Sequence, residues 1–99
     1  MVLEIAHFYV KPGMEKAFEE GAAKAAAAFK RAKGCKGMEL HRTVEKPSLY
    51  RLLVQWETLE DHTEGFRGSD NWKEWRSYVE HCWDGKPEVE HTRQVVKGF

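Results

Sequence analysis

The sequence predicts an α+β protein with a ferredoxin-like fold, in which a four-stranded antiparallel sheet carries helices on one face. Three observations lead to this prediction. The apolar residues follow strand and helix spacings in the order strand, helix, strand, strand, helix, strand. Right-handed crossovers connect that order into one antiparallel sheet with both helices on the same side. The length of 99 residues is that of one ordinary domain, so we expect a single domain over residues 1–99.

The first strand and the first helix are separated by a turn. Residues 2–10 are rich in β-branched and aromatic side chains, and they end at the Lys-Pro-Gly turn of residues 11–13. From Met14 the apolar residues recur at helical spacing for about twenty residues, up to the natural stop at Gly34. A stripe of small residues should let this helix lie close to the sheet; it consists of Gly21, Ala25 and Ala28.

A hairpin follows the first helix. Apolar and polar residues alternate over residues 38–44, residues 45–48 (Glu-Lys-Pro-Ser) form a turn, and residues 49–57 give a second strand-like run. We therefore expect the second and third strands to pair directly.

Two helices and a strand complete the chain. Thr58 and Asp61 approximate a capping box, which predicts a short helix to about Glu64. Ser69 or Asp70 caps a second helix, whose apolar stripe consists of Trp72, Trp75, Val79 and Cys82. Residues 84–87 (Asp-Gly-Lys-Pro) end that helix, and a last strand is expected over residues 88–97.

Both faces of the first strand are apolar. Leu3, Ile5 and Tyr9 lie on one face, and Val2, Ala6, Phe8 and Val10 lie on the other. Helices on one side would leave an apolar sheet face in water, which soluble proteins avoid. We therefore expect a homodimer that packs sheet against sheet.

Charge and composition narrow the functional classes. The chain has 16 Lys plus Arg and 16 Asp plus Glu, so no net field attracts a nucleic acid or an anionic membrane. A basic leader and a membrane-spanning apolar run are both missing from the sequence, which predicts a cytoplasmic location. Cys35 and Cys82 have the spacing of neither a disulfide framework nor a zinc site, so we expect buried free thiols and no metal.

Five short motifs occur in order along nearly the whole chain. The first strand ends in Lys-Pro-Gly (11–13), and the first helix ends before Gly-Cys-Lys-Gly (34–37). The hairpin contains Glu-Leu-His-Arg-Thr-Val-Glu-Lys-Pro (39–47), the third strand ends in Gln-Trp-Glu (55–57), and Asp-His (61–62) follows. In these motifs and their spacing the chain resembles the antibiotic biosynthesis monooxygenase (ABM) family of the dimeric α+β barrel superfamily.

The resemblance implies a dimeric α+β barrel and, for enzymatic members, a pocket between helices and sheet. There a phenol, hydroquinone or polyketide-type aromatic substrate meets dioxygen with no metal, flavin or other cofactor. Such chemistry needs a base and a cavity shielded from water, because a deprotonated phenol can pass an electron to dioxygen unaided. The family also contains members of unknown activity.

Histidine is the natural base near neutral pH, and the chain has five histidines. His62 matches the recurrent histidine of the family; it is a candidate catalytic residue, or it fixes the local loop. His7 shares a strand face with Leu3 and Ile5, which places it in the pocket or in the dimer interface, and a pair with His91 is conceivable. His41 and His81 are interpreted as surface residues.

Aromatic residues are candidates both for the core and for a substrate pocket. Trp72 and Trp75 are three residues apart and project to the same side of their helix, where tryptophan ordinarily packs in the core. The resemblance implies that this helix face also lines the cavity. The same two roles are open for Trp56, Phe66 and Tyr50.

Two other functions compete with this hypothesis. A heme-degrading branch of the family has an asparagine on the first strand and an axial histidine on the second helix, and those positions fall near His7 and at Trp75. Neither residue matches. The other alternative is a non-enzymatic dimer that binds a small hydrophobic ligand, because the sequence has no nucleophile with its base and no phosphate-binding loop.

Overall fold

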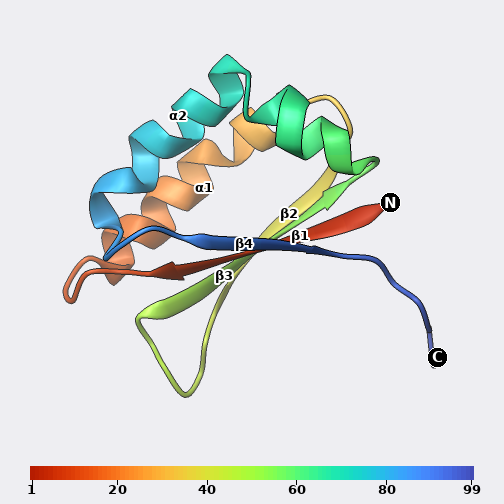
Figure 1. The fold of residues 1–99 in the computed structure, drawn as a ribbon. Coiled ribbons are helices and arrows are strands. Elements are labelled where there is room, and N and C mark those ends of the chain that lie inside the picture. Colours follow the sequence, from red (N-terminus) through yellow and green to blue (C-terminus); the bar gives the residue numbers. More distant parts are fainter.

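The computed structural model describes residues 1–99 and confirms the ferredoxin-like fold. The elements are β1 (Val2–Tyr9), α1 (Glu15–Arg31), β2 (Cys35–Arg42), β3 (Leu49–Trp56), a π-helical turn η1 (Asp61–Phe66), α2 (Asp70–Val79), a 3₁₀ turn η2 (Glu80–Cys82) and β4 (Glu88–Thr92). The strands lie in the order β2-β3-β1-β4, and every neighbouring pair is antiparallel. Both helices cover the same face of this sheet (Figure 1).

The last strand is shorter than predicted, because it ends at Thr92 and not at Lys97. The register explains this: Thr92 pairs with Leu3, so almost nothing of β1 remains for the following residues to pair with. Val95 and Val96 are accordingly 90% and 79% exposed. The C-terminal segment leads away from the sheet (Figure 1).

The predicted short helix after β3 forms a wider turn. The backbone N–H of Asp61 donates to Oγ1 of Thr58 over 3.1 Å, as the capping prediction requires. The turn then continues as the π-helical η1, in which His62 and Phe66 are both buried. Such turns are rare and occur frequently at functional sites.

The parity of β1 decides which residues enter the core. Val2, Ala6 and Phe8 point towards the helices and are buried, and Glu4 shares their face at 4% exposure. Leu3, Ile5 and His7 have the opposite parity and are only half-buried. A buried carboxylate therefore lies among apolar neighbours on the inner face of the sheet.

Gly21 brings the two helices together. A Cβ added at Gly21 would lie 2.5 Å from the carbonyl oxygen of Tyr78, at the end of α2. The expectation that this residue faces the sheet is wrong, because the close approach is to α2. Ala25 and Ala28 of the same stripe are fully buried.

The outer face of the sheet mixes apolar and charged side chains. Leu3, Ile5 and Leu53 are half-buried there, and Tyr9 is 55% exposed. Dimerisation through this face stays a prediction. None of the helices combines the length and the apolar character that a bilayer crossing requires. Cys35 and Cys82 are free thiols; Cys82 is buried as predicted, whereas Cys35 is only half-buried.

Candidate active site

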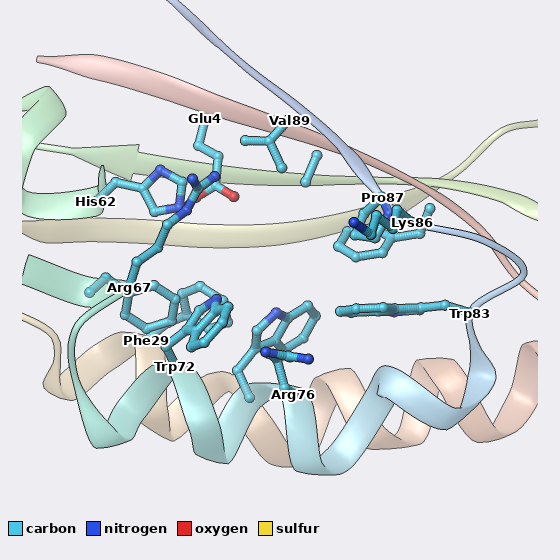
Figure 2. Close-up of a pocket in the computed structure, with 14 residues that line it drawn as sticks. Glu4, Phe29, His62, Arg67, Trp72, Arg76, Trp83, Lys86, Pro87 and Val89 are labelled. Carbon is cyan, nitrogen blue, oxygen red and sulfur yellow. The ribbon is translucent and has the colours of Figure 1, made fainter. Parts of the chain in front are cut away.

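A pocket of about 430 Å³ lies between the sheet and α2. The inner face of β1 contributes one wall through Glu4, Ala6 and Phe8. The opposite wall comes from α2. Figure 2 shows His62, Arg67 and Glu4 at one end of the pocket and Trp83, Lys86 and Pro87 at the other. Its volume lies within the range of small-molecule sites.

Glu4 is the acidic residue at the His62 end of this pocket (Figure 2). Its Oε1 accepts a hydrogen bond from Nε1 of Trp56 over 2.9 Å and lies 3.2 Å from Nε2 of His62. Burial raises the pKa of Glu4 to about 7, although the Trp56 hydrogen bond and Arg67 oppose the rise. Both contacts use Oε1, so the second carboxylate oxygen is free to meet a substrate. A carboxyl group with this pKa can accept or give a proton near neutral pH.

His62 lies beside Glu4 and is 3% exposed. Its ring stacks on the indole of Trp56, with 5.3 Å between centroids and an interplanar angle of 19°. Burial, with smaller contributions from the charges of Arg67 and His91, lowers the pKa of His62 to about 4. The imidazole is therefore neutral at pH 7, with one nitrogen that donates and one that accepts.

His91 continues the polar contacts to the edge of the sheet. Its Nε2 lies 2.7 Å from Nδ1 of His62. The register pairs Glu4 with His91 across β1 and β4, which fixes both side chains on the inner face. Burial and then Arg67 lower the pKa of His91. Because β4 is an edge strand and His91 is only half-buried, the row of contacts reaches the surface.

Aromatic rings form the rest of the pocket wall. Phe8 packs edge-on against Trp75, with 6.0 Å between ring centroids, and lies tilted against Trp83, with 5.3 Å between centroids. Phe29 stacks on Phe66 at 4.8 Å. The Nε1 of Trp83 is buried and has no hydrogen-bond partner. A flat apolar ligand would fit these walls, and an oxygen on it could accept from that indole N–H.

Positive charge dominates the polar part of the lining. Arg67, Arg76 and Lys86 line the pocket, and Glu4 is its acidic residue. The guanidinium of Arg76 lies over the ring of Trp72, 4.5 Å from its centroid, and forms an ion pair with Glu80. Because three cationic side chains face a single carboxyl group whose pKa burial raises to about 7, the pocket favours an anionic form of a ligand.

The structure brings together four of the residues predicted for the site: His62, Phe66, Trp72 and Trp75 all line the pocket. Trp56 and Tyr50 do not line it. Trp56 is fully buried beneath His62 and supports Glu4. Tyr50 packs against Phe18, and its hydroxyl donates to Glu19 over 2.5 Å, so it belongs to the core between β3 and α1.

His7 lies outside this pocket. It points to the outer face of the sheet, where its Nε2 lies 3.0 Å from Glu90. The conceivable pair of His7 with His91 does not form, because the two residues have opposite parity in the β1–β4 register. Of the two locations left open for His7, the pocket is therefore excluded.

Sequence reasoning missed several pocket residues, above all Glu4 and His91. One signal was present: Glu4 interrupts an apolar alternation of residues 2, 6, 8 and 10. A carboxylate at such a position is buried if that face meets the helices. The other missed lining residues gave no motif; they include Arg67, Arg76, Trp83 and Lys86.

Known proteins that are similar to this chain include members of one family. The model of the antibiotic biosynthesis monooxygenase family matches residues 1–78. The uncharacterized protein YczJ of Bacillus subtilis is 42% identical, over 96% of this chain and 100% of its own length. A candidate antibiotic biosynthesis monooxygenase of Bordetella bronchiseptica has a solved structure that is 44% identical, with a TM-score of 0.94 over 96% of this chain and 97% of its own.

A more distant structure shares the fold alone. SnoaB of Streptomyces nogalater, a cofactor-independent oxygenase, is 18% identical, with a TM-score of 0.81 over 98% of this chain and 95% of its own.

Proposed function

Because the chain belongs to the antibiotic biosynthesis monooxygenase family, we propose that it is a cofactor-independent monooxygenase that oxidises an aromatic phenol, hydroquinone or polyketide-type substrate with dioxygen. The observation that carries this proposal is the Glu4–His62 pair at the end of an aromatic-walled pocket. A perturbed acid–base pair inside an apolar cavity is typical of a catalytic site.

The pocket suits a flat aromatic molecule whose hydroxyl points to Glu4. Phe8, Trp75 and Phe66 offer apolar surface to the rings. Arg67 lies at the Glu4 end, where its charge would stabilise the phenolate that forms when the hydroxyl loses its proton (Figure 2). Arg76 and Lys86 could hold a second anionic or carbonyl oxygen farther along the pocket.

Glu4 is the proposed general base. As a carboxylate it takes the hydroxyl proton of the substrate, and its pKa of about 7 suits proton transfer at neutral pH. Neutral His62 holds Oε1 of Glu4, and Trp56 fixes the same oxygen from the core. His62 is thus a partner of the base.

The oxidation needs no additional reductant. The phenolate passes an electron to dioxygen, the two radicals combine, and the O–O bond then breaks. One oxygen atom enters the product and the other leaves as water, so that a hydroquinone and dioxygen give a hydroxyquinone and water. The substrate supplies all the electrons, and the apolar walls shield the intermediates from water.

We also propose that the protein is a homodimer through the outer face of the sheet, in the cytoplasm. Leu3, Ile5 and Leu53 form a half-buried apolar group on that face, which supports a covered surface. His7 then lies in the interface region and has no part in the pocket chemistry.

A heme-degrading activity has less support. The position of the axial histidine is occupied by Trp75, which is 4% exposed and packs edge-on against Phe29. His7, near the position of the first-strand asparagine, faces away from the pocket.

Oxygen uptake by the metal-stripped protein tests the proposed function. A panel of hydroquinones and anthrones is supplied to the wild type, to Glu4→Gln, to His62→Ala and to the exposed control Glu88→Gln. We expect uptake with at least one compound, loss of about 100-fold or more in Glu4→Gln, and no change in the control. No turnover with any compound, together with tight retention of an aromatic ligand, would favour the alternative of a non-enzymatic binding protein.

A further inference from the structure

Three titratable side chains connect the pocket with the edge of the sheet. Oε1 of Glu4 lies 3.2 Å from Nε2 of His62, and Nδ1 of His62 lies 2.7 Å from Nε2 of His91. Glu4 and His62 are 4% and 3% exposed, whereas His91 is half-buried on the edge strand β4. The contacts therefore lead from a buried acid to a residue that meets water.

We propose that Glu4, His62 and His91 form a proton relay between the pocket and the solvent, a role that rests on the proposed function of the same site. The carboxyl proton of Glu4 moves to Nε2 of His62, the Nδ1 proton of His62 moves to Nε2 of His91, and His91 releases its Nδ1 proton to water. Three protons move, one is released, and a carboxylate remains on Glu4. That carboxylate then accepts the hydroxyl proton of the substrate.

The chemistry of the two rings suits this path. A neutral imidazole has one N–H and one bare nitrogen, so each histidine can accept a proton on one side and release one on the other. The hydrogen bond between the histidines is short, and the Glu4–His62 contact is long enough to tighten when substrate binds. A glutamine at either histidine position could keep a hydrogen bond but could not pass a proton on.

A relay serves a purpose when the pocket is full. A bound aromatic ligand between β1 and α2 covers the Glu4 carboxyl, so water can no longer remove its proton through the pocket. The exit at His91 stays available because it lies on the other side of His62. The charge of Arg67 favours proton loss from all three groups, and Glu90 does not oppose it there, because its side chain points to the opposite face and contacts His7.

Nitrogen-15 NMR of the histidine side chains tests the relay without any substrate. We expect both His62 and His91 to carry the proton on Nδ1 at pH 6, with a coupling through the hydrogen bond between Nδ1 of His62 and Nε2 of His91. At pH 8 both rings should have switched together to the Nε2 form. In Glu4→Gln the joint switch should be lost, whereas the exposed control His81→Gln should leave it intact. Two rings that titrate independently, or a missing coupling, would overturn the relay.

Turnover gives the second readout. His91→Gln should lower kcat by about tenfold to 100-fold, as loss of a proton-transfer group does, with little effect on KM. The kcat of His91→Ala should fall by a similar factor and should recover when imidazole is added. A residue with a merely structural role would not show this rescue. Wild-type kcat and pH profile in His91→Gln would overturn the relay. If the wild type has no oxygenase activity, the proposed function fails, while the NMR experiment still decides the relay.

Discussion

Replacing Glu4 with glutamine should change how the stability of the protein depends on pH. Burial raises the pKa of Glu4 from 4.5 to about 7. The folded state therefore holds a proton that the unfolded chain has lost, and the wild type loses stability as pH rises from 4.5 through 7. His62 has the opposite effect, because folding lowers its pKa from 6.5 to about 4. The stability that neutral His62 contributes is therefore lost as the pH decreases from 6.5 to 4.

The two effects are similar in size. Each pKa shift spans about 2.5 pH units, and at about 1.4 kcal/mol per unit each corresponds to about 3–4 kcal/mol in the free energy of unfolding. In the wild type they largely cancel between pH 4.5 and 6.5, where the free energy of unfolding should be nearly flat. In Glu4→Gln only the His62 effect remains, because its main causes are burial, Arg67 and His91.

Urea unfolding followed by tryptophan fluorescence at pH 4.5, 5.5, 7 and 8 measures this difference. Relative to the wild type, the free energy of unfolding of Glu4→Gln should rise by about 3–4 kcal/mol between pH 4.5 and pH 8. The control Glu88→Gln removes an exposed carboxylate of β4 and should show no such trend. A difference between Glu4→Gln and wild type that stays constant across this range would refute the burial of an ionisable Glu4.

Three further predictions concern packing and assembly. Gly21→Ala should destabilise the protein by about 1–3 kcal/mol in thermal unfolding, because the new methyl meets the Tyr78 carbonyl, whereas Gly98→Ala, with open space around it, should be neutral. Equal melting temperatures for these two variants would contradict the close helix contact. Trp75→Ala should lower the free energy of unfolding in urea by about 3–5 kcal/mol and weaken the retention of aromatic ligands, since this side chain belongs both to the core and to the pocket wall. Unchanged ligand retention would show that Trp75 is not part of the binding site. Light scattering should give twice the chain mass for the wild type and a smaller mass for Leu53→Glu on the outer face, and a monomeric wild type would refute the sheet-to-sheet dimer.

The fold could be predicted because its signals are local. The Lys-Pro-Gly turn, the helical spacing from Met14 and the stop at Gly34 each depend on a few neighbouring residues. Gly34 indeed has a positive φ of 81°. The end of β4 could not be predicted in the same way, because Thr92 is last only through its pairing with Leu3.

The site was harder to predict because its chemistry depends on contacts between residues that are far apart in the sequence. Strand parity separated His7 from Glu4, but both faces of β1 are apolar, so the sequence did not say which one meets the helices. The contacts of Glu4 are with Trp56, 52 positions away, and with His62, which the π-helical turn buries. His62 could be identified from the family motif, whereas its partners Glu4 and His91 required the register.

The most direct test of the proposed chemistry is product analysis after turnover in isotopically labelled dioxygen. The metal-stripped wild type should convert a hydroquinone or an anthrone to a product that contains one labelled oxygen atom, with the other label in water, and Glu4→Gln should form this product far more slowly. Unlabelled product, or equal rates in the wild type and in Glu4→Gln, would contradict monooxygenation with Glu4 as the base.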